Sequence, residues 1–331
     1  MYQTKFHQAN ISGSSFLVTG GAGFIGSHIV EYLLQYGAAR VRVLDNFATG
    51  SPANIKPWLS HPGFELMEGD IRDAGTCRLA VQGMDYISHQ AALGSVPRSI
   101  NDPLTINEVN ISGFLNILQA AKEAQVKRML YAASSSTYGD SSVLPKQEDN
   151  IGKPLSPYAV TKYVNELYAD VFSRLYGFHT IGLRYFNVFG PRQNPAGPYA
   201  AVIPLFIQAA LKNEAPYING DGNTSRDFTF VENVVQANIK ALLADNITQH
   251  EVMNIACGTS ITLNELWQHI SHATGTTAAP VYRPERKGDV KHSLADVSKA
   301  FAVIGYQPTV TIKIGLEKTV EWYSKHSSVG E

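Results

Sequence analysis

Cysteine is scarce in this chain of 331 residues, which contains only Cys77 and Cys257. Neither follows a spacing typical of metal sites or disulfide frameworks, so we expect no metal centre and a thiol-reducing compartment. An excess of one charge is also missing, since 27 Lys and Arg residues balance 28 Asp and Glu residues. The net charge of −1 provides no basic field, so nucleic acid is not an expected partner.

Long hydrophobic runs are missing as well. No apolar run reaches the roughly 18 residues of a spanning helix, so a membrane is not an expected partner. The first residues lack a basic start followed by an apolar run, which argues against a signal peptide. We therefore expect a cytoplasmic protein. Apolar residues make up an ordinary 44% of the chain, and its length favours about two domains.

A glycine-rich segment, residues 19–26 (TGGAGFIG), lies between an apolar run at 15–18 and a helical stripe that includes Ile29 and Leu33. Strand, tight turn and helix form the context of a dinucleotide-binding loop. The glycines let the backbone approach a pyrophosphate, and the helix N-terminus offers free N–H groups to it. A glycine-rich turn without a ligand is the alternative.

Asp45 ends the next apolar run, residues 41–44, about 20 residues further on. A carboxylate there hydrogen-bonds the ribose hydroxyls of adenosine and repels a 2′-phosphate, which favours NAD over NADP. Together with the flanking strand and helix, Asp45 makes the ligand-free turn the weaker interpretation.

Strand-like and helix-like segments alternate along the first half of the chain. This alternation predicts an α/β fold, a Rossmann-type doubly wound parallel sheet with ligands at the carboxyl ends of its strands. The predicted strands are residues 15–18, 41–44, 64–68, 86–89, 128–133 and 180–185.

Loop-rich sequence at 190–198 indicates a domain boundary. We expect an NAD-binding domain at 1–189 and a smaller C-terminal α/β substrate-binding domain mainly at 190–331. A strand and helix from 226–257 are expected to join the first domain, since 228–231 and 252–255 resemble strands that return to either one. A capping box at 262–265 predicts the start of a helix.

Tyr158 and Lys162 are one helical turn apart. A free tyrosine has a pKa near 10, and a nearby cation lowers it, so the pair could exchange a proton near neutral pH. Taken alone, the motif is more often an exposed aromatic and a solvated lysine, but the phosphate loop reverses that preference. An apolar stripe should face away from the pair and pack; it consists of Val160, Val164, Leu167, Val171 and Leu175.

Three serines, Ser134, Ser135 and Ser136, end a predicted strand. Their hydroxyls could bind a substrate oxygen and complete a proton path to Tyr158. The alternative is a polar strand end that satisfies its own backbone groups.

These motifs resemble the extended short-chain dehydrogenase/reductase family, and within it the nucleotide-sugar 4-epimerases. The resemblance covers nearly the whole chain. It is carried by residues 19–26, 45–50, 69–71, 89–92, 134–139, 156–162 and 184–187. Residues 93–99, 200–204 and 217–222 resemble more narrowly the bacterial UDP-N-acetylglucosamine 4-epimerases of the polysaccharide-synthesis type. Relatives acting on N-acetylhexosaminuronates share these motifs, so that substrate stays open.

The resemblance implies an NAD cofactor, a UDP-sugar substrate and a homodimer that pairs through two helices per subunit. Tyr158 would take the proton of the sugar 4-hydroxyl while hydride passes from C4 to NAD. The 4-keto sugar would then turn, and hydride would return to its other face. Lys162 would hold the cofactor ribose and acidify Tyr158, and Ser134 would hydrogen-bond the 4-oxygen.

The implied cofactor contacts are the pair Tyr158 and Lys162 with Gly20, Gly23, Phe24, Ile25, Gly26, Asp45, Asn46, Gly50, Asp70, Ile71, Gln90, Ala91, Ala92, Tyr185 and Val188. The implied substrate contacts are Ser95, Ser134, Ser136, Asn187, Ala201, Val202, Tyr217, Asn219, Arg226, Arg286, Asp289 and Ser293. For each arginine alone, a surface salt bridge is an equal alternative.

Ser293 aligns with a position that is bulky in epimerases restricted to non-acetylated sugars. A small serine favours an N-acetylated substrate, with UDP-glucose also tolerated. Dehydratases and decarboxylases of the family carry acidic residues where Ser135 and Ser136 stand here, which disfavours both reactions. A non-catalytic NAD sensor would lack Tyr158 or Lys162.

Overall fold

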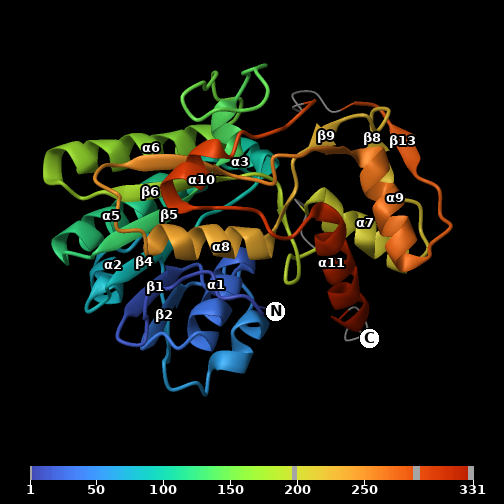
Figure 1. Cartoon of the computed structure of the whole chain (residues 1–331). Coiled ribbons are helices and arrows are strands. Elements are labelled where there is room, and N and C mark those ends of the chain that lie inside the picture. The colour runs from blue at the N-terminus through green and yellow to red at the C-terminus, as the bar shows by residue number, and fades with distance from the viewer. Residues whose placement is uncertain (1, 196–199, 286–290, 327–331) are drawn as a thin grey trace.

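The computed structural model describes residues 2–195, 200–285 and 291–326. Its centre is a parallel sheet of seven strands in the order β11-β6-β5-β4-β1-β2-β3 (Figure 1). The chain runs outward from β1 to β3 and returns to the other side of β1 with β4, which creates a switch point where ligands bind in such sheets. The strands are β1 (Ser15–Thr19), β2 (Arg40–Asp45), β3 (Phe64–Glu68), β4 (Tyr86–His89), β5 (Arg128–Ser134), β6 (Thr180–Tyr185) and β11 (Glu251–Ile255).

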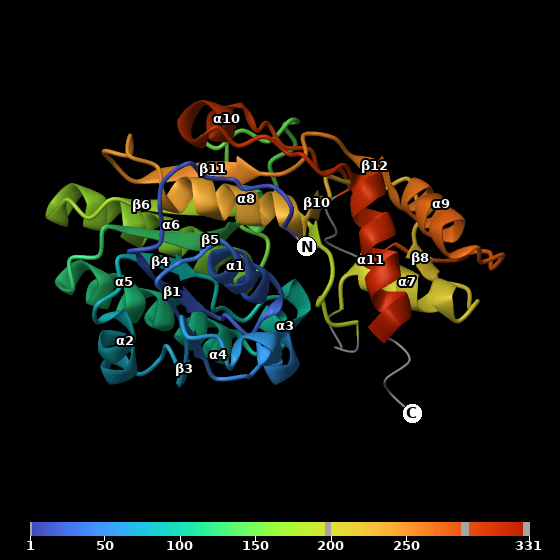
Figure 2. The same ribbon diagram turned by 60° about the horizontal axis from the view of Figure 1, so that its bottom comes forward.

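Helices cover both faces of this sheet, as Figures 1 and 2 show. One face carries α2 (Ala74–Val81), α5 (Phe114–Glu123) and α6 (Pro157–Tyr176), and the other carries α1 (Phe24–Gln35) and α8 (Val231–Leu242). Each pair of layers encloses its own apolar core. The predicted doubly wound α/β fold is therefore confirmed, and each predicted strand of the sheet lies within one or two residues of its observed bounds.

Short helical elements lie in the connections that follow β2, β4 and β5. They are η1 (Pro52–Asn54), η2 (Lys56–Trp58), α3 (Val96–Asn101), α4 (Pro103–Asn107), the π-helical turn η3 (Glu108–Gly113) and η4 (Ser135–Tyr138).

A smaller lobe lies beside the sheet at the C-terminal end of the chain (Figure 2). In it α7 (Val202–Leu211), α9 (Leu263–Thr274) and α11 (Ile312–His326) pack around one core. The predicted capping box is present, since Thr262 accepts a hydrogen bond from the Glu265 N–H and the Glu265 carboxylate accepts one from the Thr262 N–H. Short strands complete the lobe: β8 (Tyr217–Asn219) with β13 (Val281–Arg283), and β9 (Ser225–Arg226) with β12 (Ile261–Thr262).

The segment after β9 crosses back to the large sheet. The strand expected at 228–231 is shorter, because β10 (Thr229–Phe230) pairs with β7 (Val188–Phe189) and Val231 already begins α8. Further on, β11 joins the sheet beside β6, and α10 (Ser298–Ile304) packs against β11. We propose a division at residue 189 into an NAD-binding domain and a mainly substrate-binding domain, with β11 and α8 assigned to the first.

The apolar stripe of α6 does not pack within this chain. Its Val160, Leu167 and Leu175 are 46%, 48% and 69% exposed, so the expectation that this side packs is wrong for the single chain. The reason is that α6 turns its small and polar residues inward, including Ala159, Asn165, Glu166 and Ala169. Glu166 forms a buried ion pair with Arg184 of β6, 2.7 Å between Oε2 and Nη2. None of the described helices is long and apolar enough to cross a membrane.

Candidate active site

The glycine loop between β1 and α1 is built for close backbone approach. Gly20 has φ +67°, and a Cβ atom there would lie 2.8 Å from the Ala91 nitrogen. A Cβ atom on Gly26 would lie 2.1 Å from the Gly20 oxygen, so only glycine lets α1 begin this close to the loop. No acidic side chain lies in the first turn of α1, which leaves its N-terminus favourable to an anion.

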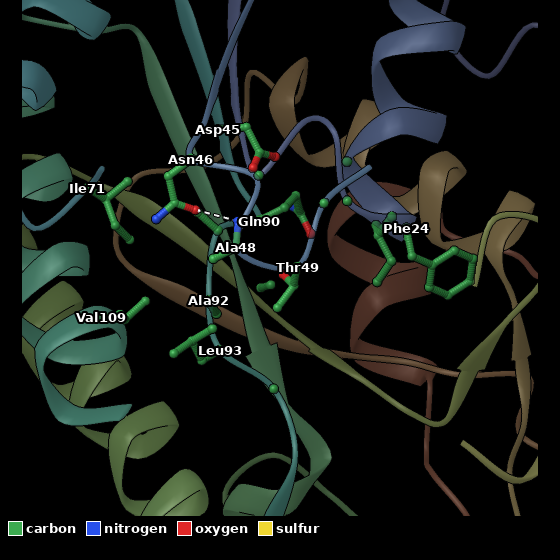
Figure 3. A pocket seen from close by; sticks show the side chains of 18 of the residues that line it. Phe24, Asp45, Asn46, Ala48, Thr49, Ile71, Gln90, Ala92, Leu93 and Val109 are labelled. Atoms are coloured by element: carbon green, nitrogen blue, oxygen red, sulfur yellow. Dashed lines mark hydrogen bonds between the residues drawn. The ribbon is translucent and has the colours of Figure 1, made fainter. Parts of the chain in front are cut away.

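The loop borders a cavity of about 500 Å³ at the carboxyl ends of the strands (Figure 3). All seventeen residues that the resemblance assigned to the cofactor line this first cavity, together with Ser134. The sequence reasoning missed other lining residues, namely Leu44, Ala48, Thr49, Gly69, Arg72, Leu93, Gly94, Thr105, Val109, Ala132 and Ala133. Most of them lie next to residues that were named, so extending each strand-end motif by one or two positions would have found them.

Polar groups at one end of this cavity are held in place by the backbone. The Asp45 carboxylate accepts hydrogen bonds from the Ala22 N–H at 2.9 Å and the Phe47 N–H at 2.8 Å. The Asn46 side chain lies nearby in Figure 3, donating to Asp70 and accepting from the Ala48 N–H. The wall thus presents fixed oxygen acceptors suited to hydroxyl groups of a ribose.

A second polar network lies behind Gln90 and Tyr185. The Tyr185 hydroxyl is 3.2 Å from Oε1 of Gln90, and it accepts a hydrogen bond of 2.9 Å from Nδ2 of Asn238 on α8. Asn238 is fully buried and was not singled out from the sequence, because only the return of α8 to the sheet brings it here. The network fixes two side chains that face the cofactor cavity.

Tyr158, Lys162 and Ser134 all line the cavity, and Tyr158 lies beside each of the other two. The Lys162 ammonium donates to the Ala132 carbonyl at 2.8 Å and lies 5.8 Å from the centre of the Tyr158 ring. Ser134 accepts hydrogen bonds from both the N–H and the hydroxyl of Ser136, at 3.1 and 2.9 Å. The three serines therefore form a connected polar strand end, in which Ser134 faces the first cavity and Ser135 and Ser136 face another.

The electrostatics of Tyr158 differ from the sequence expectation. Burial raises the pKa of Tyr158, and the hydrogen bond with Ser134 lowers it. Lys162 is not among the groups that lower this pKa, so its predicted acidifying effect is not seen in the protein alone. The reason is that burial lowers the pKa of Lys162 to about 8, below that of Tyr158, so Lys162 loses its charge before Tyr158 ionises.

Two further cavities extend from the first one toward the smaller lobe. A cavity of about 290 Å³ contains Val188, Asn187 and Arg226, together with Ala201, Val202, Tyr217 and Asn219. Another of about 460 Å³ contains Ser135, Ser136, Asn187, Arg226 and Ser293. Val188 lines both the first cavity and the 290 Å³ cavity, and Asn187 and Arg226 line both of the others, so the three form one row.

One predicted substrate residue that the structure describes lies outside this row. Ser95 lines none of the three cavities; it caps α3, accepting from the Arg98 N–H at 3.3 Å, and has φ +97°. Arg286 and Asp289 lie outside the described residues. The described part of the chain contains no cluster of three metal-binding side chains.

A Rossmann-type sheet with a glycine loop at its switch point, and a tyrosine, lysine and serine in one cavity, defines a nucleotide-dependent enzyme of redox chemistry. Comparison with known proteins narrows this class. The model of the NAD dependent epimerase/dehydratase family matches residues 16–256, so the chain belongs to that family and NAD is its cofactor. The glycine cradle and the fixed acceptors of the first cavity fit such a dinucleotide.

Several relatives are similar over almost their whole length. The UDP-glucose 4-epimerase of Mycolicibacterium smegmatis is 36% identical over 94% of this chain and 99% of its own. The structure of a UDP-N-acetylglucosamine 4-epimerase from Methanobrevibacter ruminantium, in complex with UDP-N-acetylmuramic acid, has a TM-score of 0.90 and 39% identity, covering 95% of this chain and 99% of that one. A UDP-glucose 4-epimerase from Thermotoga maritima, solved with UDP-glucose, has a TM-score of 0.88 and 37% identity, with coverage of 95% and 99%.

Proposed function

We propose that this protein is an isomerase that inverts C4 of a UDP-N-acetylhexosamine, converting UDP-GlcNAc to UDP-GalNAc through a 4-keto intermediate. UDP-Glc to UDP-Gal is a further reaction of the same site. The carrying observation is that Ser134 lines the cofactor cavity with Tyr158, while its chain neighbours Ser135 and Ser136 line the 460 Å³ cavity with Arg226 and Ser293. A sugar beside the serines, with its nucleotide extending past Arg226 into the 290 Å³ cavity, fits this arrangement, and the similar 4-epimerases support the reaction.

The protein side chains manage the proton and the orientation of the sugar. NAD, when bound, supplies a hydride acceptor and a positive charge next to Tyr158. Tyr158 takes the proton of the sugar 4-hydroxyl and returns it, and Ser134 stabilises the tyrosinate through the hydrogen bond that lowers its pKa. Lys162, fixed on the Ala132 carbonyl, orients the ribose of the cofactor.

In this proposal, the smaller lobe binds the nucleotide half of the substrate. Arg226 and Asn187 lie where two cavities meet and suit a diphosphate and its uridine, since a guanidinium can bind phosphate oxygens with two parallel hydrogen bonds. Tyr217, Asn219, Ala201 and Val202 line the 290 Å³ cavity beyond them. Arg286 and Asp289 belong to the same proposed contact set.

The composition of the 460 Å³ cavity argues against dehydration and decarboxylation. None of its described lining residues is an Asp or Glu, and Ser135 and Ser136 occupy the positions where the resemblance places acidic groups in those enzymes. Water elimination needs a general acid and a general base near the sugar. A 4-epimerase needs only one proton exchange, at the 4-oxygen, because the hydride leaves C4 and returns to it.

A 4-epimerase of UDP-N-acetylglucosaminuronate is the second candidate, because Lys146 lines the same cavity as a buried cation. A cation at that place could bind a carboxylate at C6. The Lys146 ammonium already donates to the Ser141 carbonyl, so the neutral hexosamine remains our first choice.

We also propose a cytoplasmic homodimer that pairs through α6. The exposed apolar stripe of α6 supports this, since Val160, Leu167, Val171 and Leu175 form one contiguous side of the helix that stays exposed in the described part of the chain. Burial of this stripe against its copy in a second subunit would remove a large apolar area from water.

One assay distinguishes the candidate reactions. The purified protein is incubated separately with UDP-GlcNAc, UDP-Glc and UDP-N-acetylglucosaminuronate, and the products are quantified by NMR. We expect the 4-epimer from UDP-GlcNAc at the highest kcat/KM. A higher kcat/KM with the uronate would favour the second candidate, and a 4-keto-6-deoxy product would contradict the epimerase proposal.

A further inference from the structure

A fully buried carboxylate lies behind the substrate cavities and has no part in the proposed chemistry. It belongs to Asp227, which follows Arg226 in the chain. Its Oδ1 accepts a hydrogen bond of 2.9 Å from the Cys257 N–H. Its Oδ2 accepts bonds of 3.0 Å from the Gly258 N–H and 3.3 Å from the Ala295 N–H. Burial of a carboxylate is unfavourable in free energy, so a fully enclosed carboxylate indicates a structural or functional role.

The three donors belong to two segments that are distant in sequence. Cys257 and Gly258 follow the end of β11 in the large sheet, whereas Ala295 belongs to the segment 291–296 that crosses from the smaller lobe. The Asp227 carboxylate therefore joins that crossing segment to the sheet. Charged acceptors form stronger hydrogen bonds than neutral ones, which suits a tether between separate parts of the fold.

Three polar residues of the substrate cavities are linked to the segment around Asp227, through the chain or through hydrogen bonds. Arg226 precedes Asp227 directly, and the Asn187 side chain donates to the Asp227 carbonyl at 2.9 Å. Ser293 lies two residues before Ala295, and its N–H donates to the Ser225 carbonyl at 3.1 Å. Arg226, Asn187 and Ser293 all line the 460 Å³ cavity, although they come from three separate segments. Their relative positions depend on residues 225–227.

The chemistry of the tether requires an acceptor without donors. All three partners are backbone N–H groups, and two of them, from Gly258 and Ala295, share Oδ2. An asparagine has nearly the same shape, but one end of its amide would present N–H groups to these donors. The shape of Asp227 is therefore replaceable, whereas its two acceptor oxygens are not.

We propose that Asp227 is a positioning residue for substrate recognition: its carboxylate fixes Arg226 and Asn187, which hold the UDP part of the substrate, relative to Ser293 on the sugar side of the cavity. This inference rests on the proposed function. Asp227 acts through the cavity wall and touches neither Tyr158 nor the cofactor cavity. Its loss should therefore weaken UDP binding and leave proton transfer at Tyr158 intact.

The test compares D227N with the wild type, using UDP as the probe in isothermal titration calorimetry. We expect the Kd for UDP and the KM for UDP-GlcNAc to rise at least about tenfold, as for the loss of a charged hydrogen bond. The kcat at saturating substrate should stay within about threefold, and the NAD content should be unchanged. D296N is the matched control, because Asp296 is next to Ala295 but lines none of the three cavities. Its carboxylate accepts hydrogen bonds from the Ser298 N–H at 2.9 Å and from the Gln147 amide at 3.4 Å, and an amide oxygen can still cap Ser298.

The outcomes separate this inference from the proposed function. A wild-type protein that does not bind UDP contradicts the proposed substrate and this inference with it. Wild-type UDP binding with an unchanged Kd in D227N overturns the inference alone, and so does an equal loss in D296N. If D227N does not fold, D227S, which keeps one acceptor oxygen, takes its place and must show the same rise in Kd with unchanged NAD content.

Discussion

Tyr158 is subject to two opposing influences on its pKa. Burial raises the pKa, and the Ser134 hydrogen bond lowers it, whereas Lys162 is itself weakened as a cation by burial. In the proposed mechanism the remaining decrease must come from the charge that the cofactor brings.

Removal of the Tyr158 hydroxyl tests its role directly. Y158F keeps the ring that lines the cavity and loses the proton acceptor, so turnover should fall by at least about two orders of magnitude, as for loss of a general base. The Kd for UDP should stay near that of the wild type, because the nucleotide is held elsewhere. Turnover close to the wild-type value would show that another group takes the proton.

Ser293 provides the test of substrate choice. In S293Y a phenol ring replaces a hydroxymethyl group on the wall of the 460 Å³ cavity, which the N-acetyl group must share in both sugar orientations. We expect the ratio of kcat/KM for UDP-GlcNAc to that for UDP-Glc to fall at least about tenfold, because this ratio measures relative transition-state binding. S293A is the control and should leave the ratio unchanged. Equal losses for both sugars would mean that Ser293 does not control the C2 side.

Residues differ in how far the sequence could predict them. Gly20, Gly26 and Asp45 follow from local patterns, because strand, turn and helix are consecutive in the chain. Asp227 and Asn238 could not be predicted in the same way. The hydrogen-bond partners of Asp227 lie 30 to 68 positions away in the chain, and Tyr185, the partner of Asn238, lies 53 positions away. The pKa of Tyr158 was also out of reach, because burial is a property of the folded structure.

Helix α6 combines two functions on opposite sides. Its inner side carries Lys162 and the buried Glu166, and its outer side carries the exposed apolar stripe. The 3.6-residue periodicity correctly separates these sides, but it cannot tell an apolar side that packs within the chain from one that stays exposed. The short strands β8 and β13 show the same limit, since two three-residue segments more than 60 positions apart give no pairing signal in sequence.

The α6 stripe yields a test at the level of the element. L167E places a charge in the middle of the stripe, where the residue is 48% exposed in the single chain. We expect the variant to be monomeric by light scattering at concentrations at which the wild type is dimeric, because a buried unpaired charge opposes association. L79E on α2 is the control, since Leu79 is also exposed, at 57%, but lies outside the stripe. A dimeric L167E would contradict the proposed interface.

At the scale of the whole molecule, buried histidines make stability depend on pH. Burial lowers the pKa of His28 and of His89 to about 3, and that of His250 to about 4. Below about pH 6.5 these side chains bind protons when unfolded but not when folded, so stability is lost as the pH falls toward 4. Asp227 opposes this trend, because burial raises its pKa to about 6. Between about pH 6 and 4 its carboxylate binds a proton in the folded protein but not in the unfolded chain.

The balance of about two protons predicts a decrease in the free energy of unfolding of about 3 kcal/mol per pH unit between pH 6 and 5. Urea denaturation at pH 7, 6 and 5 measures it. The loss should be smaller from pH 7 to 6, where the histidines of the unfolded chain are only partly protonated, and larger from pH 6 to 5. A free energy of unfolding that is constant from pH 7 to 5 would mean that the three histidines titrate normally in the folded protein.

In the proposed reaction the cofactor cavity and the substrate cavities work together, so that a hydride leaves C4 and returns to the same carbon. UDP-GlcNAc carrying deuterium at C4 tests this most directly, in ordinary water and without added NAD, with the product analysed by NMR. We predict UDP-GalNAc that retains the deuterium at C4, because the hydride never exchanges with solvent. Product with hydrogen at C4, or no 4-epimer at all, would contradict the account.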